Sequence, residues 1–172
     1  MKTRVKKAFS EKQIARRISK LGAQIRKDAG KAELFLLGVL KGASFFLADL
    51  MRAIPGEVSY GFIDVIREMA DTEVATAMEI DYLQWADIRG KHVYLLKDVV
   101  STGVIETYLL QQLRQKGPSE LKLVALVDRP DLRTIALDVD YRAFQADHRG
   151  VFVGYGLELY GKYANLPYIG RV

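Results

Sequence analysis

The chain contains no cysteine and only two histidines among its 172 residues. The absence of cysteine excludes disulfide bonds, zinc sites built from thiolates and a cysteine nucleophile. No apolar run approaches the roughly 20 residues that a membrane-spanning helix needs, and no hydrophobic signal segment follows the basic start. His92 lies beside a predicted strand start and His148 in a predicted turn, so both are expected at the surface. We therefore expect a cytoplasmic protein without membrane contact.

Positive charge is concentrated near the start of the chain. The net charge is +5, and much of the excess lies in Lys2, Arg4, Lys6, Lys7, Lys12, Arg16 and Arg17. A solvated tail and helix face is the expected explanation, and a patch for RNA or another polyanion is the alternative. Because no aromatic residue lies among these charges before Phe9, stacking on single-stranded bases has little support. Nucleic acid is therefore an unexpected partner.

Helical and strand-like apolar patterns alternate along the chain, which is typical of an α/β fold. Ser10 and Gln13 fit a capping box that begins a helix, and Gly30 ends it. Two more apolar helices should follow Lys41 and the turn at Gly103. Strands are expected at 33–39, 58–63, 93–96, 121–127, 139–144 and 151–153. Without an internal repeat or linker, residues 1–172 should form a single domain with a parallel sheet that binds ligands at the carboxyl ends of its strands.

The stretch from Arg67 to Asp87 has no steady hydrophobic period. It is predicted to be either a loop with strands or a helical insert, and the pattern does not separate the two. Trp85, within it, is expected to serve packing.

The most informative segment runs from Val93 to Thr107. An apolar strand leads into Lys97 and Asp98, then into a small Ser-Thr-Gly turn and a helix. Unpaired backbone N–H groups and the dipole at a helix start favour an anion. A phosphate site is therefore expected at this turn, formed by Ser101, Thr102, Gly103, Val104 and Ile105.

Four segments of the chain resemble the hypoxanthine-guanine phosphoribosyltransferases. They are GVLKGASFFLADLMRAI (38–54), VYLLKDVVSTGVIETYLL (93–110), LVDRPDLR (126–133) and VFVGYGLELYGKYANLPYIG (151–170). The resemblance implies a type I phosphoribosyltransferase fold, in which a parallel sheet flanked by helices carries a small hood built from both chain ends. It also implies the transfer of phosphoribosyl from its pyrophosphate to a purine base, with magnesium as cofactor, in a dimer or tetramer.

The resemblance also implies roles for individual residues. Leu40, Lys41 and Gly42 match the loop that binds pyrophosphate. Arg129, Phe152 and Val153 match the residues that bind the purine, and Lys97, Asp98 and Glu158 occupy the ribose and metal positions. Ser101 stands at the position of the general base, and Asp98 is the retained acidic residue beside it.

The chain departs from the family pattern at several of these positions. Lys97 replaces a carboxylate, so magnesium binding should be weak or absent. Ser101 replaces an aspartate, and a serine hydroxyl is no general base near neutral pH unless it is activated. Ile105 lacks a hydroxyl for the phosphate, and Ala164 replaces an arginine that clamps pyrophosphate. The mobile catalytic loop also differs, with Val65 and Ile66 in its usual Ser-Tyr positions.

Three hypotheses follow from these matches and departures. The first is a protein that binds a purine nucleoside monophosphate or a purine base, with weak or no transferase activity and no required metal. The alternative is an active, magnesium-dependent purine salvage enzyme in which Asp98, Asp64, Glu68 or Asp71 acts as the base. The third is a regulatory module that binds RNA or a protein through its basic N-terminal helix.

Overall fold

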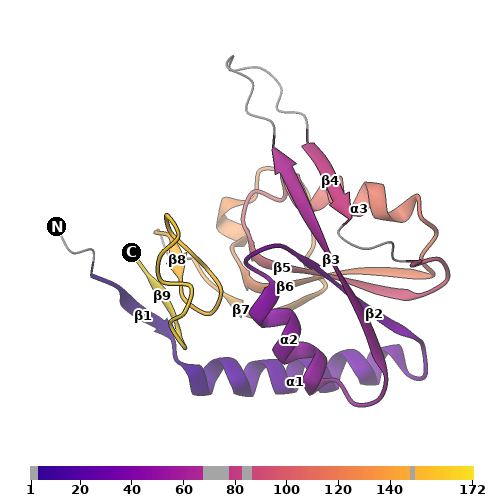
Figure 1. Ribbon diagram of the computed structural model, residues 1–172, viewed down its shortest axis with the longest axis horizontal. Coiled ribbons are helices and arrows are strands. Elements are labelled where there is room, and N and C mark those ends of the chain that lie inside the picture. The colour runs from indigo at the N-terminus through magenta and orange to yellow at the C-terminus, as the bar shows by residue number, and fades with distance from the viewer. Residues whose placement is uncertain (1–3, 68–77, 83–86, 148–149) are drawn as a thin grey trace.

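A six-stranded, mostly parallel sheet forms the centre of the molecule (Figure 1). The computed structural model describes residues 4–67, 78–82, 87–147 and 150–172. The sheet has the order β4-β3-β2-β5-β6-β7, and only the β3–β4 pair is antiparallel. Its strands are β2 (Leu34–Val39), β3 (Val58–Arg67), β4 (Met78–Tyr82), β5 (His92–Val100), β6 (Glu120–Asp128) and β7 (Tyr141–Gln145).

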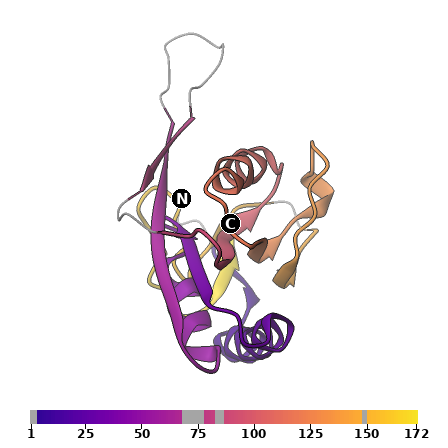
Figure 2. The ribbon, with the colours of Figure 1, turned by 90° about the vertical axis from the view of Figure 1, so that its right-hand side faces the viewer.

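Helices cover both faces of this sheet (Figure 2). Helices α1 (Glu11–Ala29) and α2 (Ser44–Ala53) pack on one face, and α3 (Val104–Arg114) packs on the other. The predicted capping box is present, because the Ser10 and Gln13 side chains each bind the other residue's backbone N–H. Along α1 the apolar residues recur at helical spacing and are buried, so the periodicity explains how this helix lies on the sheet.

The central strands have continuous apolar sequences because both of their faces are buried. Every residue of β2 is buried, and it pairs in parallel with both β3 and β5. Tyr94 and Leu96 of β5 point into the core under α1 and α2, whereas Val93 and Leu95 point into the core under α3. Lys97 pairs with Ala125 of β6, which belongs to the core under α3, so its side chain starts from that face of the sheet.

Both ends of the chain form a small separate sheet, as the family resemblance implied. Strand β1 (Lys6–Phe9) pairs with β9 (Ile169–Arg171), which pairs with β8 (Phe152–Val153). This hood and both marked termini lie at one end of the molecule (Figure 1). Phe9 anchors the hood by stacking on Phe144 of the main sheet, with the ring centroids 4.0 Å apart.

Some of the basic N-terminal residues have structural contacts. The Lys7 ammonium lies over the Tyr168 ring, 4.6 Å from its centroid. The Arg17 side chain donates a hydrogen bond to the Ala143 carbonyl oxygen at 2.6 Å. These contacts join the two ends of the chain and fasten α1 to β7.

Most helix and strand boundaries agree with those predicted from the sequence, and the main differences lie near the cavity-lining strands β3 and β5. β5 continues past Leu96 to Val100, so Asp98 is part of the strand and not of the turn. β3 extends to Arg67, and β4 supplies a strand within the ambiguous stretch. Trp85, Glu68, Asp71 and His148 lie outside the described residues. In the described ranges no helix is long and apolar enough to cross a bilayer.

Candidate functional site

A cavity of about 540 Å³ opens at the carboxyl ends of the parallel strands, next to the hood. The loops that follow β2, β5 and β6 meet here, and the start of β8 and the segment after it close the other side. The lining residues are Leu40, Lys41, Gly42, Asp64, Asp98, Val99, Ser101, Arg129, Gly150, Val151, Phe152, Gly156, Leu157 and Glu158. Segments far apart in sequence are thus brought together where α/β sheets bind their ligands.

The loop after β2 passes very close to Asp98. A Cβ atom built on Gly42 would lie 2.0 Å from the Asp98 Oδ2 atom, so only glycine fits at this position. The peptide bond between Leu40 and Lys41 is cis. The Ser44 hydroxyl donates to the Lys41 carbonyl oxygen and ties the loop to the first turn of α2.

Lys97 binds the acidic residue that follows it. Its ammonium contacts the Asp98 Oδ1 atom, and the two side chains are 16% and 21% exposed. Asp98 lines the cavity, whereas Lys97 is not part of the lining. The Lys97 ammonium thus contacts one carboxylate oxygen of Asp98, Oδ1, whereas Gly42 lies against the other, Oδ2.

The predicted phosphate turn lies between β5 and α3. Gly103 has a φ angle of +88°, the left-handed conformation that glycine adopts without steric cost, and α3 begins at Val104. The loop after β6 supports the turn from behind. Arg133 donates to the Ser101 carbonyl oxygen at 2.5 Å, and the Thr134 N–H donates to the Thr102 carbonyl oxygen at 3.1 Å. These bonds hold the turn from behind, and of the five predicted residues only Ser101 lines the cavity.

The opposite end of the cavity combines an aromatic ring with a cation. The Arg129 guanidinium lies 5.7 Å from the centroid of the Phe152 ring and donates to the Gly150 carbonyl oxygen at 3.1 Å. Both side chains are more than nine-tenths buried, yet both line the cavity. Val153 is fully buried and is not part of the cavity lining, whereas Val151, two residues before it, is part of the lining.

Three carboxylates face the cavity: Asp64, Asp98 and Glu158. Asp64 accepts a hydrogen bond from the Val65 N–H at 2.8 Å. Within the described ranges, however, no three acidic or histidine side chains converge closely enough to hold a metal by themselves. Any divalent cation here would need further oxygen ligands from water or a bound substrate.

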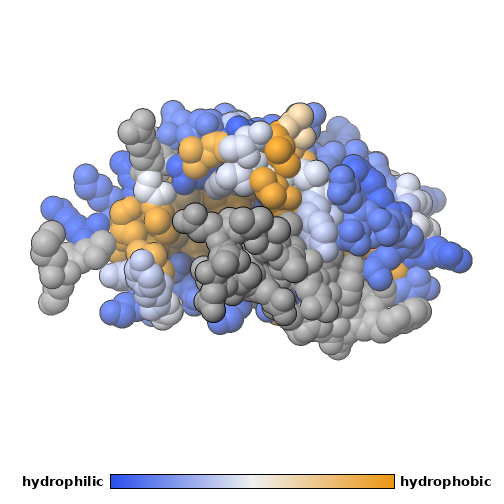
Figure 3. Space-filling view, turned by 90° about the horizontal axis from the view of Figure 1, so that it is seen from above, coloured by the Kyte–Doolittle hydropathy of each residue, from blue (hydrophilic) through white to orange (hydrophobic). Residues whose placement is uncertain are grey.

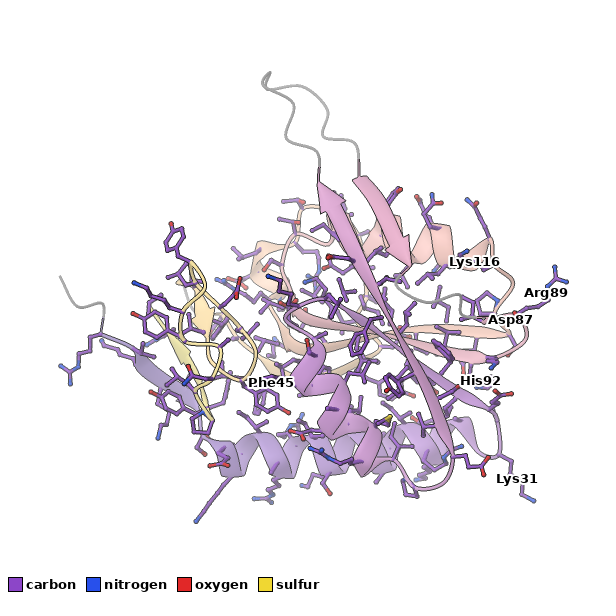
Figure 4. The ribbon with its side chains drawn as sticks, viewed as in Figure 1. Lys31, Phe45, Asp87, Arg89, His92 and Lys116 are labelled. Atoms are coloured by element: carbon purple, nitrogen blue, oxygen red, sulfur yellow. The ribbon has the colours of Figure 1, made fainter. Side chains whose placement is uncertain are left out.

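Two other residues discussed from the sequence, Ala164 and His92, lie outside the cavity lining. Ala164 is not in the lining, and its carbonyl oxygen accepts a hydrogen bond from the Gly156 N–H at 2.9 Å. His92 lies at the end of the molecule opposite the hood, close to Arg89 and Asp87 (Figure 4). Its Nδ1 atom is 3.0 Å from Glu120 Oε2, so it takes no part in the cavity.

Hydrophobic surface accompanies the cavity end of the molecule. Seen from above, apolar residues gather over the centre and the hood end, and the opposite end is mostly hydrophilic (Figure 3). Phe45 of α2 and Val151 are among the large apolar residues that are partly exposed. Phe45 also makes an edge-to-face contact with Tyr155 of the hood, so α2 supports the segment that closes the cavity.

Sequence reasoning missed two buried acidic residues close to the site. Asp128 is 2% exposed and binds both Arg133 and Arg142. Glu106, on α3, is 3% exposed. Its position was readable from spacing, because Glu106 precedes Leu109, Leu110 and Leu113 on the same helix face.

Comparisons with known proteins identify the family and the fold. The model of the phosphoribosyl transferase domain matches residues 6–158. The hypoxanthine-guanine phosphoribosyltransferase of Streptococcus pneumoniae is 32% identical over 161 residues, covering 94% of this chain and 89% of that protein. The chain belongs to the hypoxanthine-guanine phosphoribosyltransferase family. The Bacillus subtilis phosphoribosyltransferase of the same name is 30% identical over 166 residues, with the same two coverages.

Solved structures of phosphoribosyltransferases agree with this assignment. A hypoxanthine-guanine phosphoribosyltransferase from Bacillus anthracis has a TM-score of 0.86 and 32% identity, with 99% of both chains covered. A hypoxanthine phosphoribosyltransferase from Staphylococcus aureus has a TM-score of 0.87 and 30% identity, with 97% of this chain covered. The type I phosphoribosyltransferase fold, with its parallel sheet and hood, is thereby confirmed.

Proposed function

We propose that this protein forms purine nucleotides by transferring the phosphoribosyl group of phosphoribosyl pyrophosphate to a 6-oxopurine. The observation that carries this proposal is the single cavity shared by Gly42, Asp98 and Ser101 at one end and Arg129 and Phe152 at the other. One end offers groups for phosphate and ribose, and the other offers groups for a flat base. The family relatives described above bear the name of this reaction.

The base end favours a 6-oxopurine over adenine. A guanidinium carries only hydrogen-bond donors, so Arg129 matches the exocyclic oxygen of hypoxanthine or guanine and not the amino group of adenine. The Phe152 ring supplies an apolar face for stacking. Together they predict a clear preference for hypoxanthine and guanine.

The other end supports ribose and phosphate binding. Asp98 accepts hydrogen bonds only, as a ribose diol requires, and the N-terminus of α3 favours the 5′-phosphate. The loop at 40–42 lies against Asp98 and would face the leaving pyrophosphate. Ser101, Thr102 and Gly103 supply the turn, and Ile105 contributes no hydroxyl.

The donor set fits magnesium bound together with a substrate. Mg²⁺ is commonly held by one or two carboxylates plus substrate phosphates, and not by a cage of protein ligands. Asp98 and Glu158 provide such carboxylates in the cavity lining. A bound magnesium ion would offset the negative charge that the departing pyrophosphate develops.

Proton transfer from the purine needs a group other than Ser101. No described side chain is seen to activate the Ser101 hydroxyl, and that position is therefore not assigned the proton. Of the base candidates from the sequence, Asp64 and Asp98 lie in the lining and can accept one. Glu68 and Asp71, the other candidates from the sequence, lie outside the described residues.

The test is nucleotide formation by protein purified from a host that lacks its own purine phosphoribosyltransferases. We expect inosine monophosphate from hypoxanthine and phosphoribosyl pyrophosphate with magnesium, and little product from adenine. Asp98→Asn, prepared in the same way, should lower turnover strongly. Equal activity in the Asp98→Asn preparation would show that the product comes from a contaminant, and no activity in the native protein would refute the proposal.

The ion pair between Lys97 and Asp98 favours a second candidate, nucleotide binding with slow or no turnover. It is the expectation drawn first from the sequence, and the comparisons give it no support. Calorimetry distinguishes it, because inosine monophosphate would then bind tightly to a protein that makes no product. Assembly as a dimer or tetramer and a cytoplasmic location stay predictions, and light scattering tests the first of them.

A further inference from the structure

Helix α3 buries a carboxylate that the proposed reaction does not use. Glu106 is 3% exposed and shares the buried face of the helix with Leu109, Leu110 and Leu113. These leucines pack against Val93 and Leu95 of β5. An ionised carboxylate in such a place is costly unless cations lie nearby.

Two cations lie close enough to act on Glu106. The pKa of the Glu106 carboxyl is raised, chiefly by burial, and a backbone hydrogen bond and the positive charges of Lys97 and Arg133 counter part of that rise. Arg133 is already engaged by the buried carboxylate of Asp128. Lys97 pairs with Ala125 of β6, which belongs to the core under α3, so it starts from the same side of the sheet as Glu106.

Lys97 and the two carboxylates that act on it, Asp98 and Glu106, can be counted as a group of charges. Lys97 contributes one positive charge, and Asp98 and Glu106 contribute one negative charge each. The group carries a net charge of −1 with Glu106 ionised, and no net charge without it. Only the negative group attracts a divalent cation to Asp98.

We propose that Glu106 is a positioning residue that offsets the charge of Lys97 from behind, so that Asp98 keeps enough negative charge to bind magnesium pyrophosphate. This inference rests on the proposed function, because it concerns the same end of the cavity. Lys97 then need not abolish metal binding, although it replaces a carboxylate of the family pattern.

The probe is magnesium pyrophosphate, titrated calorimetrically into the folded protein at several magnesium concentrations. Glu106→Gln should weaken its binding about tenfold, since one nearby unit charge is lost. Lys97→Met should strengthen binding by a similar factor. The double variant Lys97→Met/Glu106→Leu, which again carries a net charge of −1, should return to within about threefold of the native affinity.

A purely structural role for Glu106 predicts a different pattern, in which every variant binds more weakly and the double variant is the worst. That pattern would overturn the inference, as would unchanged binding by Glu106→Gln. Glu33→Gln, at the opposite end of the sheet, is the matched control and should bind like the native protein. If the native protein itself does not bind magnesium pyrophosphate, this inference and the proposed function both fail. If the native protein binds magnesium pyrophosphate and Glu106→Gln binds it equally well, only this inference fails and the proposed function stands.

Discussion

Replacing Gly42 with alanine should damage the site without altering the fold. The added Cβ atom would lie 2.0 Å from Asp98 Oδ2 and 2.7 Å from Asp98 Cγ, whereas ordinary contacts begin at 3.4 Å. The backbone at Gly42 has no positive φ angle, so strain comes from this contact and not from the alanine backbone. Either the loop or the Asp98 carboxylate must move by more than 1 Å.

Such a shift is large for a catalytic group. A misplacement of about 1 Å can reduce catalysis about 100-fold, which equals about 2.7 kcal/mol of transition-state stabilisation. We expect Gly42→Ala to lower kcat/KM for hypoxanthine by about that factor. Its thermal unfolding should stay close to that of the native protein, because the collision lies at the rim of the cavity and not in the core.

A double-mutant cycle identifies the cause. Asp98→Ala removes the oxygen that the new methyl group would meet, so Gly42→Ala should cost little further affinity in that background. The assay is the calorimetric Kd for inosine monophosphate, which remains measurable when turnover is lost. The reasoning is refuted if Gly42→Ala keeps its activity within threefold, or if it weakens binding equally in both backgrounds.

Three further predictions follow from other contacts. The double variant Lys97→Glu/Ser101→Asp should increase turnover and the dependence of turnover on magnesium, because it places two carboxylates in the site. A kinetic magnesium titration that gives an unchanged or lower kcat would contradict this prediction. Asp128→Asn should lower the free energy of unfolding by about 3 kcal/mol, because the buried Asp128 carboxylate is the partner of Arg133 and Arg142. Urea denaturation measures this loss, and a change of less than about 1 kcal/mol would show that the two ion pairs contribute little. Burial raises the pKa of Tyr94 to about 12, so the contribution of Tyr94 to stability is complete below pH 10 and is lost as pH rises toward 12. The free energy of unfolding should fall there by up to about 1.4 kcal/mol per pH unit. In Tyr94→Phe this fall should disappear from unfolding curves measured at alkaline pH, and an identical fall in the variant would assign it to other groups.

Much of the fold was readable from local patterns. The capping box at Ser10, the continuous apolar run of β2 and the helical period of α1 each have a direct physical cause, and the structure has them where they were expected. The apolar pattern predicted a strand at 151–153, where β8 lies, but the hood as a unit was expected only from resemblance, because β1 and β9 are too short to carry a pattern of their own. They are held by pairing between the two ends of the chain, which local sequence does not encode.

The site could be read only in part, because its chemistry depends on which faces meet. Sequence indicated that Lys97 replaces an acidic residue, but not that its ammonium contacts Asp98. Glu106 was not singled out from the sequence, although its spacing to Leu109, Leu110 and Leu113 places it on the buried face of α3. The support of the phosphate turn by Arg133 likewise joins residues 32 positions apart. The contact between Arg133 and Ser101 is tertiary, and the contact between the neighbours Lys97 and Asp98 depends on side-chain conformations that the sequence does not encode.

The most direct test of the account is a crystal structure of the protein with inosine monophosphate. The account predicts the base against Phe152 with its 6-oxygen facing Arg129, the ribose at Asp98, and the phosphate at the start of α3. A nucleotide bound elsewhere, or one turned so that its phosphate meets Arg129, would contradict it.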